Sequence, residues 1–233
     1  MTDAARDKWR EVRAMDTAGT LPLGPNTFDR FIHDPKRLGF YSARYSFAAK
    51  MLQGCGTIID IGCGDGFFDL TLLTDTDAHW VLGVDFDEAL IRYAAETLLP
   101  AFNAANPNRS DRVDFMHADF LSPNGPFQGW DGAVSMDCIE HIEPDDAPSF
   151  IQRMAAALSP NGVAVIGTPN QYASHFASPH SKVGHINLYT PDRLREAMQV
   201  EFPRVFMFGM NDGTLNMGHE QLWHYVIGVG VKG

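Results

Sequence analysis

From residue 57 onward, short apolar runs alternate with segments whose apolar residues recur at helical spacing. The first run, Thr57-Ile58-Ile59, is β-branched and has no polar alternation, which is typical of a strand covered on both faces. Phe67 to Leu73 then follows with helical spacing. Further strands are predicted over residues 80–84, 113–118, 130–136, 204–208 and 223–229. Strands that alternate with helices predict an α/β fold with a mostly parallel sheet.

The N-terminal part has a different pattern. Residues 1–39 are polar and rich in charge and turn residues, with a predicted helix over 4–15, and we interpret them as a cap segment. Residues 40–52 predict an amphipathic helix packed before the first strand. The predicted main domain is therefore 40–233.

Composition and charge narrow the class of protein. With 18 basic and 29 acidic residues the formal net charge is −11, which opposes binding to long nucleic acid. No apolar stretch approaches the roughly 20 residues of a membrane span, and no secretory signal is recognisable. Cys55, Cys63 and Cys138 lack metal-ligand spacing and cannot all pair, which fits a reducing cytoplasm.

The most informative motif is the loop Asp60-Ile61-Gly62-Cys63-Gly64-Asp65-Gly66, which connects the first predicted strand to the helix that follows it. Glycines there let the backbone turn tightly and approach a ligand, at the edge where open α/β sheets bind nucleotides. The dinucleotide-binding motif G-x-G-x-x-G has its third glycine at the position that Phe67 occupies in this chain. A nicotinamide-dependent oxidoreductase is therefore a remote alternative.

Asp85 ends the second predicted strand, where an acid can accept both hydroxyls of a ribose. The alternative is that Asp85 or Asp87 caps the following helix. Two neighbouring acids can also fill both roles.

The spacing acid-x-Gly-x-Gly-x-Gly, together with Asp85, Asp119 and the turn and strand over residues 158–166, resembles class I S-adenosylmethionine (SAM)-dependent methyltransferases. The resemblance implies a Rossmann-like, seven-stranded, mostly parallel sheet with helices on both faces and an antiparallel C-terminal hairpin at its edge. It also implies SAM as cofactor and S-adenosylhomocysteine as product. The predicted cofactor-binding residues are Asp60, Gly62, Cys63, Gly64, Gly66, Asp85, Phe86, Asp119, Phe120, Met136 and Arg44. For Arg44 the alternative is an exposed cation.

A second group of residues follows the fourth strand, in Asp137-Cys138-Ile139-Glu140-His141. If a helical turn starts there, Asp137, Glu140 and His141 share one face. Two carboxylates and an imidazole side by side favour a divalent cation between them. Downstream lies His185, with His175 and His180 as possible substitutes.

This layout resembles the metal-dependent small-RNA 2′-O-methyltransferases and ubiquinone-biosynthesis O-methyltransferases, which implies a metal site of Asp137, Glu140, His141 and His185. Asp137 is the least secure ligand, because the RNA-directed family has Glu there and Asp reaches less far. The ion would be Mg²⁺, Mn²⁺, Fe²⁺, Co²⁺ or Zn²⁺.

The predicted reaction is methyl transfer from SAM to a hydroxyl of a small polar acceptor, a saccharide unit or a secondary metabolite. Catalytic roles fall to Glu140, His141 and His185. In the alternative without metal, His141 or His185 is the general base of an O- or N-methyltransferase. A non-catalytic SAM-binding module is a further alternative. The polar segments 170–187 and 210–220 are the predicted lid and acceptor-recognition loops, and the C-terminal hairpin allows an oligomer.

Overall fold

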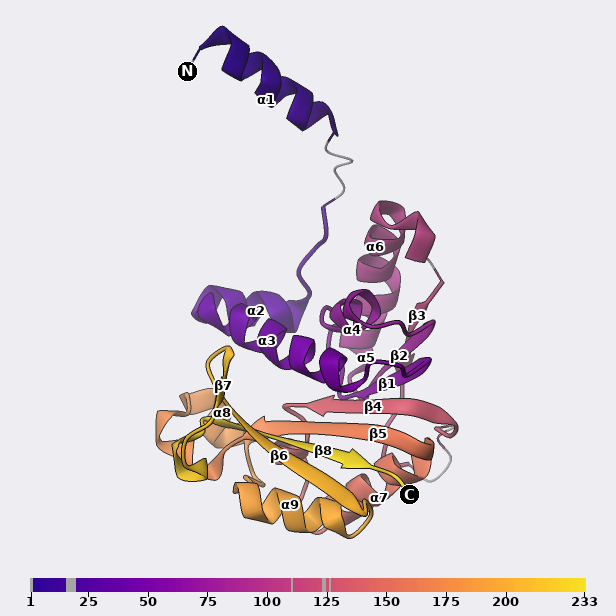
Figure 1. The fold of residues 1–233 in the computed structure, drawn as a ribbon, viewed down its shortest axis with the longest axis vertical. Helices are drawn as coiled ribbons and strands as arrows, with labels where there is room; N and C mark the ends of the chain where they lie inside the picture. The colour runs from indigo at the N-terminus through magenta and orange to yellow at the C-terminus, as the bar shows by residue number, and fades with distance from the viewer. Residues whose placement is uncertain (1, 16–19, 110, 123–124, 126) are drawn as a thin grey trace.

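The computed structural model describes residues 2–15, 20–109, 111–122, 125 and 127–233. Within them one sheet has the strand order β3-β2-β1-β4-β5-β8-β6-β7 (Figure 1). β1 to β5 are mutually parallel, and β8, β6 and β7 continue the sheet in antiparallel fashion. The bounds are β1 Thr57–Ile61, β2 Trp80–Asp85, β3 Val113–His117, β4 Trp130–Met136, β5 Leu158–Pro169, β6 Arg204–Asn211, β7 Thr214–Asn216 and β8 Tyr225–Val231. The predicted α/β Rossmann-like fold is confirmed.

The prediction of seven strands is wrong by one. The short strand β7 pairs with β6 through Asn211↔Thr214, inside the segment interpreted as a polar loop. Asp212 takes a left-handed φ of 54°, and with Gly213 it makes a tight turn that folds the chain back. The sheet edge is therefore the β6–β7 hairpin, because β8 lies between β5 and β6.

Helices cover both faces of the sheet (Figure 1). Ile58 packs into a core with α3 and α4, whereas Ile59 and Ile61 point into the opposite core with α7 and α9. The helices are α1 Asp3–Met15, α2 Pro25–His33, α3 Lys36–Met51, α4 Asp69–Asp75, α5 Glu88–Tyr93, α6 Leu99–Ala105, α7 Ala147–Ala157, α8 Pro179–Gly184 and α9 Pro191–Gln199. Short 3₁₀ segments span Pro107–Arg109, Ile139–His141, Gln171–Phe176 and Glu220–Leu222, and a π segment spans Ala94–Leu98. No helix in the described ranges is long and apolar enough to cross a bilayer.

The predicted cap segment contacts the glycine loop through α2. Thr27 is buried, and its backbone N–H and hydroxyl donate to the two carboxylate oxygens of Asp65 at 2.7 and 2.8 Å. The Tyr93 hydroxyl donates to the Leu23 carbonyl at 3.0 Å. The proposed boundary at residue 39 falls inside α3, and residues 1 and 16–19 of the cap lie outside the described ranges.

Candidate active site

The glycine loop fits tightly between β1 and α4. Gly62, Gly64 and Gly66 all have left-handed φ angles, of 82°, 62° and 75°. A Cβ at Gly66 would lie 2.3 Å from the ring of Phe115, and one at Gly62 would lie 2.9 Å from the Cys138 side chain. The loop conformation therefore requires glycine.

Beneath the loop lie two buried acids. Neither oxygen of Asp60 or Asp69 meets a hydrogen-bond donor in good geometry among the described residues. Burial raises the pKa of Asp60 to about 7; the nearby Tyr45 hydroxyl lowers it, and the Asp85 charge raises it. Burial, then the Asp60 charge, raises the pKa of Asp69 well above its ordinary value. Burial beneath the loop therefore favours the protonated form of both acids.

Of the two acids, Asp87 takes the capping role that the sequence left open. Asp87 is the N-cap of α5, and its carboxylate accepts from the backbone N–H of Ala89 and Leu90. Asp85 accepts from the Gly64 N–H at 2.8 Å and the Asp87 N–H at 2.9 Å. Each carboxylate oxygen of Asp85 keeps a further lone pair for a ligand.

A cavity of about 650 Å³ opens at the carboxyl ends of β1, β2 and β3, and we call it the crevice. Five of the predicted cofactor-binding residues line it: Gly62, Asp85, Phe86, Asp119 and Phe120. Phe86 is 77% exposed, whereas Phe120 is buried in the core. The sequence missed His117 and Cys138, which also line it.

The remaining predicted cofactor residues do not line the crevice. Cys63 and Met136 are buried in the core, and Asp60 lies beneath the loop. Arg44 lies over the Tyr225 ring at 3.7 Å and forms an ion pair with Asp137 at 2.8 Å. The alternative of an exposed cation is wrong, because the Arg44 side chain is only 15% exposed. Its guanidinium is also not free to bind a ligand carboxylate, because it is paired with Asp137.

The sequence also missed a second arginine, Arg30 of α2, whose guanidinium lies 4.2 Å from the centre of the Tyr41 ring. Burial lowers the pKa of Arg30, but the negative charges near its guanidinium, including Asp137 and Asp65, together have the larger effect. The net result is a raised pKa of Arg30. Arg30 is therefore a cation held between the cluster after β4 and the glycine loop.

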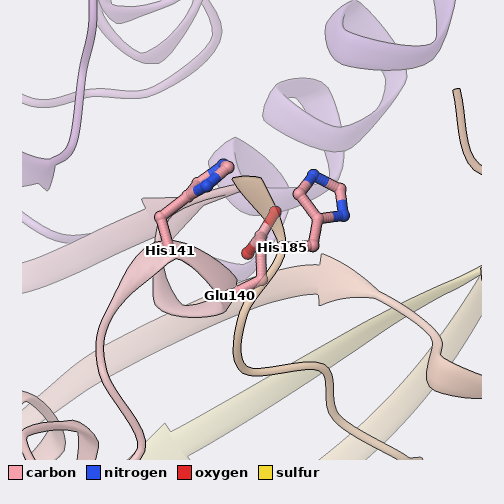
Figure 2. Close-up of side chains that lie close together, drawn as sticks. All are labelled: Glu140, His141 and His185. Atoms are coloured by element: carbon pink, nitrogen blue, oxygen red, sulfur yellow. The ribbon is translucent and has the colours of Figure 1, made fainter. Parts of the chain in front are cut away.

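Glu140, His141 and His185 form a cluster whose ligand atoms all lie within 4.8 Å of one another (Figure 2). The first two come from the 3₁₀ segment Ile139–His141 and the third from the loop after α8. The predicted helical face is wrong, because Asp137 has a left-handed φ of 53° and precedes the 3₁₀ segment. Asp137 pairs with Arg44 and lies outside this cluster.

Glu140 is fully buried, and the Thr168 hydroxyl donates to its Oε2 at 3.0 Å. Its Oε1 has no hydrogen-bond partner among the described residues. Burial, then the Asp137 charge, raises the pKa of Glu140 to about 8. An orphaned carboxylate oxygen beside two imidazoles is a donor set that fits Mn²⁺, Fe²⁺, Co²⁺ or Zn²⁺.

The two histidines have defined ring positions. The Gly184 carbonyl can only accept, so His141 donates to it from Nδ1 at 2.8 Å and keeps a lone pair on Nε2. Burial and the proximity of His141 lower the pKa of His185, which favours its neutral, ligating form. Of the loop histidines, His175 packs on Phe176 and His180 lies near His33, both outside the cluster.

Residues 31–200 match a family model described as a methyltransferase domain. The chain is 29% identical over 114 residues to a probable S-adenosylmethionine-dependent methyltransferase of Mycolicibacterium smegmatis, which covers 49% of this chain and 38% of that protein. It is 27% identical over 165 residues to the small RNA 2′-O-methyltransferase of Rattus norvegicus, covering 67% of this chain and 42% of that protein. The chain thus spans less than half the length of these two relatives.

Among solved structures, the methyltransferase domain of bacterial CtHen1-C superposes with a TM-score of 0.67 at 19% identity. The superposition covers 83% of this chain and 99% of that one. At this identity the likeness concerns the fold.

Proposed function

This chain belongs to the family of class I SAM-dependent methyltransferase domains, and on that premise we propose that it methylates a hydroxyl of a small polar acceptor with the help of a divalent cation. The observation that carries the proposal is the cluster of Glu140, His141 and His185 at the border of the crevice. The buried, orphaned Oε1 of Glu140 is the part of it that most needs a cation.

SAM fits the crevice by two features of the chain. The three glycines hold the loop in left-handed conformations, and Gly62 lines the crevice. Asp85 is positioned by two backbone N–H groups and keeps lone pairs for a ligand. Asp85 would bind the ribose hydroxyls, Phe86 and Phe120 would contact the adenine, and Asp119 would accept from its amino group. These roles follow the family resemblance.

For the cation, Glu140, His141 and His185 would be the ligands. A bound divalent ion lowers the pKa of an acceptor hydroxyl and fixes its oxygen. The chain's own contribution is positioning: Thr168 orients Glu140, the Gly184 carbonyl fixes His141, and the Asn187 N–H donates to the Glu140 carbonyl at 3.0 Å, which ties the His185 loop to the 3₁₀ segment. Arg44 pairs with Asp137 and offsets its charge beside this group.

A second candidate keeps the methyl transfer and removes the metal. The free Nε2 lone pair of His141, at the edge of the crevice, suits a general base that takes the hydroxyl proton directly. The relatives include both O- and N-methyltransferases, so the choice of oxygen rests on the cluster. The net charge of −11 supports a small acceptor over long RNA. Three free cysteines support a reducing, cytoplasmic setting.

The test is methyl transfer from labelled SAM to a panel of hydroxylated acceptors, using protein stripped of metal and then resupplied with Mg²⁺, Mn²⁺, Fe²⁺, Co²⁺ or Zn²⁺. We expect turnover to depend on one of these ions and to be lost in His185→Ala. His175→Ala is the matched control, because His175 lies in the same polar segment but outside the cluster. Full turnover of stripped protein would select the histidine base, and no uptake of S-adenosylhomocysteine would refute both versions.

A further inference from the structure

A second cavity, of about 300 Å³, adjoins the cluster, and we call it the side cavity. His185 lines the side cavity, whereas His141 lines the crevice. The two imidazole rings lie edge to face with centroids 5.0 Å apart. The cluster therefore separates two cavities, and if the crevice holds the methyl donor, the side cavity is where an acceptor can reach the same residues.

The two cavities differ in charge. The crevice is lined by the acids Asp85, Asp119, Glu143 and Asp146 and, within the described ranges, by no lysine or arginine. The side cavity is lined by Arg37 and Lys182 and, among the described residues, by no carboxylate. In a chain with a net charge of −11, this is a local reversal of sign.

Neither cation has an acidic partner among the described residues. In the described part of the chain, the side chains of Arg37 and Lys182 form no salt bridge with an acid. By contrast, Arg44 and Arg195 both pair with carboxylates. Two unpaired cations that face one cavity attract an anionic ligand.

The rest of the lining suits a small ligand with polar and apolar parts. The hydroxyls of Ser178 and Ser181 lie 3.0 Å apart, and Ser174 lines the same cavity. Phe176 and His224 supply a ring pair with centroids 5.4 Å apart. A volume of about 300 Å³ is at the lower end of the range for small-molecule sites.

We propose that the side cavity binds the acceptor, and that the acceptor carries an anionic group, a phosphate or a carboxylate, in addition to the hydroxyl that is methylated. Arg37 and Lys182 bind the anionic group, while His185 lies at the hydroxyl end. The inference rests on the proposed function for the identity of the cluster, but the anion site itself can be tested without turnover.

The probe is inorganic phosphate, followed through the ring signals of His185 and His224 in NMR spectra of histidine-labelled protein at fixed pH and ionic strength. Acetate is titrated in parallel to separate phosphate from carboxylate recognition. We expect saturable shifts with at least one of these anions, and at least tenfold weaker binding in the double variant Arg37→Gln/Lys182→Gln. The matched control is Lys50→Gln/Arg92→Gln, which removes the same charge from exposed positions on α3 and α5.

Two results would overturn the inference: no saturable shift with either anion, or equal affinity in the wild type and the Arg37/Lys182 double variant. Uptake of S-adenosylhomocysteine, measured on the same samples, reports on the crevice alone. Anion binding without methyl transfer to any acceptor would therefore refute the proposed function and leave the anion site standing.

Discussion

The buried Asp60 carboxyl makes the stability of the cofactor-free protein depend on pH in a direction that the structure fixes. Its pKa rises from 3.8 to about 7 on folding, because burial penalises the charged form. Well below pH 3.8 the carboxyl is protonated in both states, so Asp60 does not destabilise the fold. As the pH rises toward 7, the unfolded chain loses the proton and the folded chain retains it, so stability falls.

The magnitude follows from the two pKa values. They differ by about 3, and each pKa unit corresponds to about 1.36 kcal/mol, so the loss above pH 7 is about 4 kcal/mol. Asp60→Asn keeps the shape and removes the titration. The new amide has donors that lack partners, but their penalty is the same at every pH. The pH dependence of the difference between the two proteins is therefore the informative quantity.

The assay is urea unfolding of both proteins without cofactor at pH 5, 6, 7 and 8. The stability of Asp60→Asn relative to the wild type should increase by roughly 1 kcal/mol per pH unit up to about pH 7 and then level off. Asp69 is present in both proteins, but only the wild type has the Asp60 charge that raises the pKa of Asp69. The difference in stability between the two proteins therefore includes the repulsion between the two acids. Asp145→Asn, on an exposed loop, is the control and should give a flat difference. A flat difference for Asp60→Asn would refute the reasoning.

Three further predictions concern the loop, the cluster and the cap. Gly64→Val should weaken S-adenosylhomocysteine binding at least tenfold in calorimetry, because φ is 62° beside the crevice; Gly129→Val, at φ 84° with open space around it, is the control and should bind normally. Glu140→Gln should lose tightly bound divalent metal, measured by elemental analysis, while S-adenosylhomocysteine affinity changes less than twofold; retained metal would remove Glu140 from the ligand set. Thr27→Val should lower the unfolding free energy by about 1–3 kcal/mol in urea titrations, since a buried hydroxyl bond to Asp65 is lost; an unchanged midpoint would contradict that role.

Local patterns predicted much of this molecule. The β-branched run at Thr57-Ile58-Ile59 and the glycines after it fixed the position of β1 and of the loop, because these are short-range properties of the chain. The resemblance of Glu140-His141 and the downstream His185 to metal-dependent O-methyltransferases anticipated the grouping of these three residues.

What the sequence could not provide depends on contacts between distant segments. The pairing of Arg44 with Asp137 joins residues 93 positions apart, and Thr27 meets Asp65 across 38 positions. Helical spacing suggested a face shared by Asp137 and Glu140, but a left-handed φ at Asp137 turns its side chain toward Arg44 instead. Arg30 carries no motif, and only the packing of α2 brings it over Tyr41.

The interior position of β8 has a consequence for biosynthesis. β8 fills the slot between β5 and β6, yet it leaves the ribosome after every other strand. Until residues 225–231 emerge, the outer edge of β5 and the inner edge of β6 both present unpaired backbone groups, and the apolar side chains of Val226 and Ile227 have not yet filled their places. A nascent chain that stalls before β8 emerges therefore exposes two unpaired, aggregation-prone sheet edges. We expect chaperones to bind the nascent chain most often at this stage.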